Sequence, residues 1–394
     1  MRVLIVSRYK ENFADHQLPF VTEQGESLRA AGCEIDYFLI KGSYIKAVGA
    51  LKAKIREFKP DIVHAHFGLS AITAELQNMV PVVTTFHNGE TLNWYVNLMS
   101  SLFSLRAKHV IYVAQHIRDL SYFKAKNYSI IPCGVPMEQM VITPKDEARK
   151  QLGWGADKKY ILFGGAFDNL RKNYSLLRNA VELLCNQKNT EKNKESQAYA
   201  AQSVIVNLSV NEQDSLHTNC QSPFTDTDKS YLSDSLQKTQ KISSSNATAI
   251  QWEKVDGGEQ FGNIVCIEMK GLSRVECVLR MCAADLFALP SHSEGSPQAL
   301  KEAMAVNCPC LATDIADVRV LFGDEPGHWI LRNPRKTHER WDADEQSLSE
   351  MVQLLNDAMM YEGRTNGRER ILALGLSNEQ VAQRIIDIYK SIIK

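Results

Sequence analysis

Residues 285–305 read DLFALPSHSEGSPQALKEAMA. The apolar run at the start of this stretch predicts a buried strand, and the turn that follows contains Glu294 and Gly295. Ser296 as N-cap and Pro297 at the first helical position predict that a helix begins there. In open α/β sheets, ligands bind beyond the carboxyl ends of the strands. Free N–H groups at the start of this helix favour an anion, such as a phosphate, or a polarised sugar oxygen.

The same alternation of apolar runs and helical stretches extends over most of the chain. Apolar runs separated by helices indicate parallel strands that are covered on both faces. The alternation pauses near residues 136–144 and then restarts, which predicts two Rossmann-like α/β domains and a hinge near residue 140. One larger α/β sheet is the alternative. Strands are expected at 3–6, 34–40, 61–64, 80–85, 110–113, 129–131, 160–165, 264–269, 285–289 and 310–313.

A polar segment interrupts the second of these domains. Between residues 187 and 258, 31 of 72 residues are Ser, Thr, Asn or Gln. This composition cannot bury enough apolar surface to offset chain entropy, which predicts a disordered insertion; a small irregular subdomain is the alternative. The expected boundaries are 1–140 for the N-terminal domain and 141–376 for the C-terminal domain. Residues 377–394 are expected to form a helix that packs back on the N-terminal domain.

Composition excludes several classes of protein. The chain of 394 residues has 45 Lys and Arg against 46 Asp and Glu, a net charge of −1, whereas nucleic-acid-binding proteins usually carry a basic excess. The apolar run 3–6 is too short for the core of a signal peptide, and no run approaches the roughly 18 apolar residues of a membrane span. Nine cysteines without a CxxC pair predict reduced thiols in the cytoplasm.

Two glutamates of the opening stretch, Glu294 and Glu302, lie eight positions apart. One carboxylate can meet a group at the tip of the predicted helix while the other meets a group on its flank. A nucleotide sugar presents hydroxyls in this way on its hexose and its ribose. A single glutamate in a helix is more often solvated, so the prediction depends on the pair together with Gly295 and Pro297. A GxGxxG fingerprint and a Walker A loop are both missing.

At these residues the sequence resembles glycosyltransferase family 4, whose members are retaining enzymes of the GT-B fold, some of them in bacterial surface-polysaccharide assembly. Residues 293–314 are similar to the family signature EGxPxxxxEAMAxxxPxxAT, and the glutamate pair matches its E-x7-E motif. Residues 61–67, 82–87 and 130–135 are similar to landmarks of the N-terminal half, and residues 377–390 are a weaker match.

The resemblance implies roles for individual residues. Glu302 would bind the donor ribose, and Glu294 would contact the donor sugar. Lys172 matches the lysine that binds the donor diphosphate, and His87 matches the histidine that faces the donor sugar. His87 and Glu294 are therefore the expected catalytic residues. Gly295, Ser296 and Pro297 would complete the donor-binding turn.

The chain departs from the family pattern at several places, one of which is the first N-terminal loop, where the glycine pair of many members is missing. Ala166 follows Gly165 where the family usually has arginine, and we expect Arg171 to substitute for it. Asn88 stands where a glycine usually follows the histidine that matches His87. A lone histidine is more often structural, and this reading is favoured for the histidines at positions 64 and 66.

The resemblance also implies the partners. The co-substrate is expected to be a nucleoside-diphosphate sugar, without a metal ion, and the acceptor a saccharide or a lipid-linked saccharide. Lysines and an arginine around the amphipathic stretch 45–58 predict peripheral binding to an anionic membrane at its inner face; an ordinary solvated helix is the alternative. A sugar-nucleotide epimerase of the same architecture and a non-catalytic nucleotide-sugar-binding protein are the alternative functions.

Overall fold

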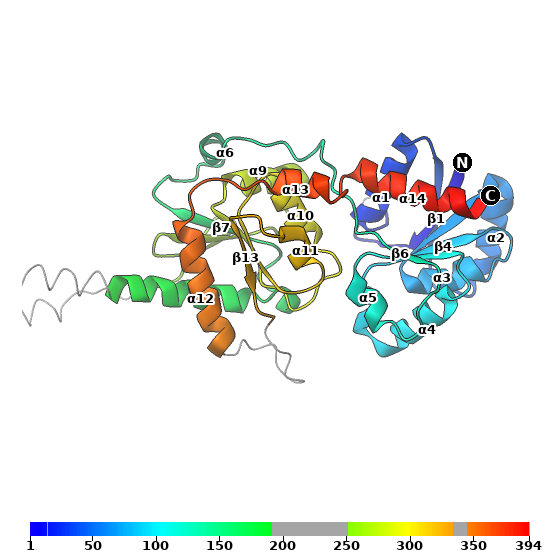
Figure 1. The fold of residues 1–394 in the computed structure, drawn as a ribbon, viewed down its shortest axis with the longest axis horizontal. Coiled ribbons are helices and arrows are strands. Elements are labelled where there is room, and N and C mark those ends of the chain that lie inside the picture. The colour runs from blue at the N-terminus through cyan, green and yellow to red at the C-terminus, as the bar shows by residue number, and fades with distance from the viewer. Residues whose placement is uncertain (14, 191–250, 334–344, 394) are drawn as a thin grey trace, which may run out of the picture.

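The computed structural model describes residues 1–13, 15–190, 251–333 and 345–393, which form two α/β domains side by side (Figure 1). The sheet of the N-terminal domain is parallel, in the order β2-β1-β3-β4-β5-β6. Strands β3 and β4 are buried along their whole length, because helices cover both faces of the sheet. The strands are β1 (Arg2–Arg8), β2 (Glu34–Ile40), β3 (Ile62–His66), β4 (Val82–Phe86), β5 (His109–Tyr112) and β6 (Tyr128–Ile130).

The helices of the N-terminal domain divide between the two faces of its sheet. Leu28 of α1 packs on one face with Val3 and Ile5, and Leu51 of α2 packs on the other with Leu4 and Val6. The helices are α1 (Pro19–Ala30), α2 (Ala47–Phe58), α3 (Gly68–Glu75), α4 (Trp94–Ser104) and α5 (Gln115–Leu120), with the 3-10 helix η1 (Gly89–Leu92).

The sheet of the C-terminal domain has the order β13-β12-β11-β7-β10-β9-β8 among the described residues. Five of its strands are parallel, and β8 and β9 form an antiparallel hairpin at one edge. Because this sheet is separate from the N-terminal one, the alternative of a single larger sheet is wrong. The strands are β7 (Lys159–Phe163), β8 (Glu253–Val255), β9 (Gly258–Phe261), β10 (Ile264–Glu268), β11 (Leu286–Leu289), β12 (Cys310–Thr313) and β13 (His328–Leu331).

Helices also cover both faces of the C-terminal sheet. Leu300 and Met304 of α10 belong to the core on one face, and Leu177 and Met351 belong to the core on the other. The helices of this domain are α6 (Lys145–Leu152), α9 (Arg274–Ala283), α10 (Gln298–Ala305), α11 (Val318–Phe322), α12 (Glu345–Met360), α13 (Gly367–Ala373), the 3-10 helix η2 (Leu170–Lys172) and a helix described over 174–190. The last helix, α14 (Asn378–Ile393), packs on the N-terminal domain.

The prediction that residues 187–258 form a disordered insertion is wrong at the two ends that the structure describes. Residues 187–190 continue a helix, and residues 253–255 form β8, which pairs with β9. The indole Nε1 of Trp252 donates to Glu182 Oε2 over 3.2 Å, so the chain is already packed two residues after it re-enters the described part. The rest of the predicted insertion lies outside the described residues.

Helix α14 returns from the C-terminal domain to the N-terminal one (Figure 1). Its residues Val381, Ile385 and Tyr389 are buried in the same core cluster as Val3 and Ile5 of β1. Of the predicted segment 377–394, residues 378–393 form α14, which packs on the first domain; residue 394 lies outside the described residues. The chain passes between the domains twice, once near residue 135 and once near residue 377. The two segments are hydrogen-bonded to each other, because the backbone of residue 135 bonds to that of residues 376 and 378.

Within the described ranges, no helix is long and apolar enough to cross a bilayer.

Candidate functional site

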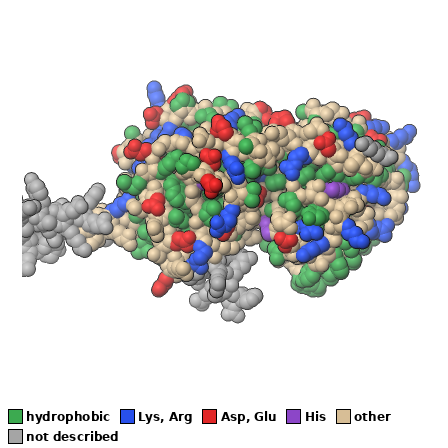
Figure 2. All heavy atoms as spheres, in the orientation of Figure 1, with side chains coloured by type: hydrophobic (Ala, Val, Ile, Leu, Met, Phe, Trp, Pro, Cys, Tyr) green, Lys and Arg blue, Asp and Glu red, His purple; other side chains and the backbone are tan. Residues whose placement is uncertain are grey.

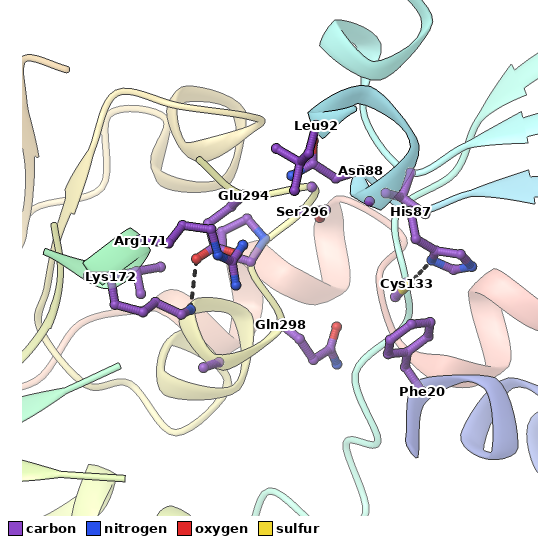
Figure 3. A pocket seen from close by; sticks show the side chains of 16 residues that line it. Phe20, His87, Asn88, Leu92, Cys133, Arg171, Lys172, Glu294, Ser296 and Gln298 are labelled. Carbon is purple, nitrogen blue, oxygen red and sulfur yellow. Dashed lines mark hydrogen bonds and ion pairs between the residues drawn. The ribbon is translucent and has the colours of Figure 1, made fainter. Parts of the chain in front are cut away.

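A cavity of about 560 Å³ lies between the two domains. Figure 3 shows its side chains converging from both sides: η1 and the end of β4 from the N-terminal domain, and η2 and the turn before α10 from the C-terminal domain. Seven of the eight residues predicted for the site line this cavity: His87, Arg171, Lys172, Glu294, Gly295, Ser296 and Pro297. Residues at the carboxyl ends of β4, β5 and β11 line it, which is the position expected for a ligand site in parallel sheets.

The strongest polar contact in the cavity joins Lys172 to Glu294. The Lys172 ammonium Nζ lies 2.7 Å from Glu294 Oε1, and Arg171 Nη1 lies 3.5 Å from Glu294 Oε2. Arg171 also donates to the backbone oxygen of Ser293 over 3.1 Å. The side chains of Lys172 and Glu294 are only 15% and 10% exposed, so little water screens their charges. Two cations and one carboxylate leave the wall with a net positive charge, which suits an anionic ligand.

Two glycines allow the close approaches on which this arrangement depends. A Cβ at Gly165 would lie 2.9 Å from Lys172 Cγ, so the lysine side chain passes over backbone that must stay bare. A Cβ at Gly295 would lie 2.6 Å from the backbone oxygen of His87, which belongs to the other domain. The turn before α10 therefore rests directly on the N-terminal domain.

The start of α10 differs from the prediction in its cap. The helix begins at Gln298 with Pro297 in the N-cap position, and no side chain caps it. Ser296 lies one residue before the N-cap, and its hydroxyl donates to Asp317 Oδ2 over 2.7 Å. The residues of the first turn, Gln298 and Ala299, line the cavity, so the positive end of the helix lies at its wall.

His87 lines the cavity, but its ring points into the N-terminal domain (Figure 3). Its Nε2 lies 3.1 Å from His66 Nδ1, and its Nδ1 lies 3.8 Å from Cys133 Sγ. Burial holds the pKa of His87 well below its usual range, and the neighbouring His66 lowers it further. The imidazole is therefore neutral at pH 7, and both of its nitrogens already have neighbours within the first domain.

Glu90, which no sequence motif marks, holds the loop after β4. Its buried carboxylate accepts hydrogen bonds from the backbone N–H groups of Gly68, over 2.8 Å, and His87, over 3.1 Å. Asn88, which lies between His87 and Glu90 in the sequence, has a φ of 98°, a conformation that favours glycine. Asn88 also donates to Ser293 Oγ over 3.4 Å, so this loop contacts the C-terminal domain through a side chain as well as a carbonyl.

Glu302 is the predicted site residue that does not line the main cavity. Its carboxylate Oε1 lies 3.2 Å from Arg274 Nη2, and the same guanidinium lies 2.6 Å from Glu23 of the N-terminal domain. Burial raises the pKa of Glu302 above its ordinary value. The arginine was missed because neither Arg274 nor Glu23 belongs to a sequence motif, and folding alone brings them together.

Two further side chains of α10 reach across to the first chain crossing. The fully buried Lys301 donates from Nζ to the backbone oxygen of Cys133 over 2.6 Å, and Gln298 donates to that of Gly134 over 2.7 Å. Burial lowers the pKa of Lys301. The helix that carries the glutamate pair is thus fixed to the segment on which the domains would turn.

No group of three or more His, Cys, Asp or Glu side chains is placed to hold a metal ion within residues 1–13, 15–190, 251–333 and 345–393.

Comparison with known families gives two matches. Residues 16–139 match the family described as Glycosyltransferase Family 4, and residues 268–356 match the family described as Glycosyl transferases group 1. One relative is TuaC of Bacillus subtilis (strain 168), whose name describes it as a teichuronic acid biosynthesis glycosyltransferase. It is 25% identical to this chain over 287 residues. That alignment covers 68% of this chain and 57% of TuaC, so the chain matches little more than half the length of this relative.

Solved structures share the architecture of the whole chain. Sucrose-phosphate synthase from Thermosynechococcus elongatus superimposes with a TM-score of 0.64 at 16% identity, covering 99% of this chain and 98% of that one. HepE from Anabaena, in complex with UDP, gives a TM-score of 0.61 at 12% identity and covers 99% and 100%. At such low identity these likenesses show the fold. The two family matches contain the residues that line the cavity except Arg171 and Lys172, and together with the shared fold they lead to one conclusion: each domain matches a glycosyltransferase family, and the chain has the GT-B fold.

Proposed function

We propose that the chain is a retaining glycosyltransferase that moves a sugar from a nucleoside-diphosphate sugar to a saccharide or a lipid-linked saccharide. The observation that carries this proposal is the cavity between the domains, where Lys172, Arg171, Glu294 and the start of α10 meet. HepE has been solved with UDP and with UDP-glucose, which supports a nucleotide sugar as donor here.

The Lys172 ammonium would bind the donor diphosphate. Its Nζ lies 2.7 Å from Glu294 Oε1, so donor binding would exchange a carboxylate partner for a diphosphate partner. This exchange frees the Glu294 carboxylate to accept a hydrogen bond from a hydroxyl of the donor sugar. A compact ammonium then stabilises the charge that develops on the departing diphosphate.

Transfer with retention takes place on one face of the sugar. The bond from the anomeric carbon to the diphosphate oxygen breaks, and the bond from that carbon to the acceptor oxygen forms on the same face. The acceptor proton passes to the departing phosphate oxygen, so charge and protons balance. The proposal needs no resident metal ion, because Lys172, Arg171 and the start of α10 face the diphosphate.

The roles of His87 and Glu302 each require a change of partner. The His87 ring must turn away from Cys133 to meet the donor sugar, and as a neutral imidazole it would donate or accept a hydrogen bond without adding charge. Glu302 must exchange Arg274 for the ribose hydroxyls, after which Arg274 still contacts Glu23.

The acceptor is proposed by analogy with the relative from Bacillus subtilis, whose name places it in teichuronic acid biosynthesis. Peripheral attachment to the inner face of the membrane would bring the cavity to a lipid-linked acceptor.

The test begins with a thermal-shift screen of nucleoside diphosphates and their sugars, because ligands that bind the native state raise its melting temperature. Transfer is then measured with the selected donor and an acceptor, with and without EDTA; the proposal expects EDTA to leave the rate unchanged. Lys172→Ala should abolish transfer and weaken diphosphate binding, whereas Lys270→Ala, at an exposed lysine of the same domain, should change neither.

Other results would contradict the proposal. Wild-type transfer by Lys172→Ala would refute the diphosphate role. Release of an epimerised sugar nucleotide without acceptor would identify an epimerase, and tight donor binding without any turnover would identify a binding protein.

A further inference from the structure

Helix α4 buries polar side chains and exposes three of its apolar ones, whereas its other apolar side chains are partly buried. The buried residues of α4 are Asn97, Ser100, Ser101 and Ser104. Trp94 and Tyr95 at its start are 66% and 53% exposed, and Leu102 near its end is 44% exposed. A surface helix of a globular protein normally has the opposite pattern, with its apolar stripe toward the core.

Close packing against α3 explains the buried half of this pattern. A Cβ at Gly68 of α3 would lie 2.2 Å from the Cβ of Ser100, so the two helices touch where both residues are small. Ser101 and Ser104 donate their hydroxyls to backbone oxygens within α4, over 2.7 and 2.9 Å. Packing thus requires small residues on the inner side, but it gives no reason for Trp, Tyr and Leu on the outer side.

The exposed apolar surface continues onto the end of α5. The Asn97 side chain donates to the backbone oxygen of Leu120 over 2.9 Å and accepts from the backbone N–H of Tyr122, which joins the two segments. In Figure 2, apolar side chains gather at the end of the N-terminal domain where Figure 1 places α4 and α5. We call this surface the α4–α5 face; it is formed by Leu92, Trp94, Tyr95, Leu102, Leu120 and Tyr122.

The segment that carries the α4–α5 face is mainly positive. Residues 91–128 contain five Lys or Arg and one Asp, a net charge of +4. Lys124 is exposed two residues after Tyr122 of the face, whereas Lys108 and Lys126 line a separate pocket with Ile392 of α14. Exposed tryptophan and tyrosine beside lysine and arginine are typical of segments that lie in the interface of an anionic bilayer.

The amphipathic stretch 45–58 exposes less apolar surface to a membrane than the α4–α5 face does. The apolar residues of α2, Leu51, Ile55 and Phe58, are buried in the core, and Lys54 is paired with Asp36 at 2.7 Å. Helix α2 can therefore offer charge to a membrane but little apolar surface.

The α4–α5 face is continuous with the cavity. Leu92, which is 59% exposed, belongs to the face and also lines the cavity with Asn88 and Gly89. We propose that the α4–α5 face inserts into the interface of an anionic bilayer, and that a lipid-linked acceptor passes from that bilayer along Leu92 into the cavity. The second half of this proposal rests on the proposed function; the first half does not.

The test uses the full chain and vesicles of phosphatidylcholine with or without phosphatidylglycerol, in the absence of donor and acceptor. Trp94→Ser combined with Leu102→Ser should lower the partition coefficient onto anionic vesicles by about tenfold or more. The matched control is Val320→Ser combined with Met360→Ser, which removes two apolar side chains of 59% and 72% exposure from the other domain and should have no effect.

A second measurement depends on position. Acyl chains brominated near the interface should quench part of the tryptophan fluorescence of the wild-type chain, and Trp94→Phe should remove that quenching. Trp154, Trp252 and Trp329 lie in the C-terminal domain and should not contribute.

Three results would overturn the proposal: no binding of the wild-type chain to anionic vesicles, equal binding by the double variant, or self-association that the double variant abolishes without any vesicle binding. The last would show that a second copy covers the face. Failure of the proposed function would appear separately, as no nucleotide in the thermal-shift screen and no transfer. If both proposals hold, the double variant should lose transfer to a vesicle-borne acceptor and keep transfer to a soluble one.

Discussion

Replacing Glu294 by glutamine should make the chain bind a nucleoside diphosphate more tightly and transfer sugar more slowly. Glu294 Oε1 lies 2.7 Å from the Lys172 ammonium Nζ, and Glu294 Oε2 lies 3.5 Å from Arg171 Nη1. A nucleoside diphosphate without a sugar must displace this carboxylate from Lys172. It has no sugar hydroxyl that could donate a hydrogen bond to the carboxylate in return. The variant removes the competitor and the repulsion between two anions, but it also removes the carboxylate that would accept a hydrogen bond from the donor sugar.

The size of the effect follows from burial and distance. Two unit charges about 4 Å apart attract by roughly 4 kcal/mol at an effective dielectric constant near 20. Desolvation of side chains that are 15% and 10% exposed offsets part of this attraction, leaving a net gain of about 1–2 kcal/mol. Since 1.4 kcal/mol corresponds to tenfold in a binding constant, the dissociation constant of the diphosphate should fall by about tenfold.

Isothermal titration calorimetry at fixed ionic strength measures this constant, with the nucleoside diphosphate that the thermal-shift screen selects. Glu302→Gln is the matched control, since it changes the other carboxylate of the pair and should weaken binding by removing a ribose contact. The double variant Lys172→Met with Glu294→Gln should bind no more tightly than Lys172→Met alone. Unchanged or weaker diphosphate binding by Glu294→Gln would refute the competition between carboxylate and diphosphate.

Three further predictions concern the domain contact, the core and acid stability. Gly295→Ala should lower the rate of transfer at least about tenfold, measured as kcat, because its methyl group would meet the His87 carbonyl at 2.6 Å and displace the turn; an unchanged kcat would contradict this. Asp285→Asn should lower the free energy of unfolding by about 3 kcal/mol in urea, since this buried carboxylate has cation partners at 2.6 and 2.7 Å, whereas Asp168→Asn, in an exposed pair, should leave the midpoint unchanged. Burial lowers the pKa of His66 to about 3, so between about pH 6.5 and that value the folded state binds fewer protons than the unfolded state. The free energy of unfolding should therefore fall on acidification by up to about 1.4 kcal/mol per pH unit. His66→Gln should lose less stability than the wild-type chain between pH 7 and 5, and an equal loss would disprove the assignment.

The strands could be predicted because parallel strands buried on both faces are nearly continuous apolar runs. The run 160–163 became β7, and 286–289 became β11. Strand β13 was missed because its four residues, His328–Leu331, include a histidine and a tryptophan and are only partly buried. The β8–β9 hairpin was missed because its polar composition, EKV and GEQF, resembles the segment before it.

The site could be predicted only where its chemistry is carried by local motifs. Lys172 and Glu294 belong to recognisable stretches, and folding brings both to one cavity. The predicted Ser296 cap is wrong because the helix begins one residue later, and Ser296 donates to Asp317, which is distant in the sequence. The surroundings of His87 and Glu302 depend on Cys133, Arg274 and other residues whose proximity exists only in the folded chain.

The return of α14 has a consequence for how the chain is made. The first domain to leave the ribosome is the last to be completed, because the core around β1 also needs Val381, Ile385 and Tyr389. Until residues 378–393 have been synthesised, the apolar groove beside α1 stays open to other nascent chains and to chaperones. The core of the second domain also includes Met351, Ile371 and Leu376, so it is completed only shortly before that of the first. Both cores therefore stay incomplete until nearly all of residues 1–393 have been synthesised.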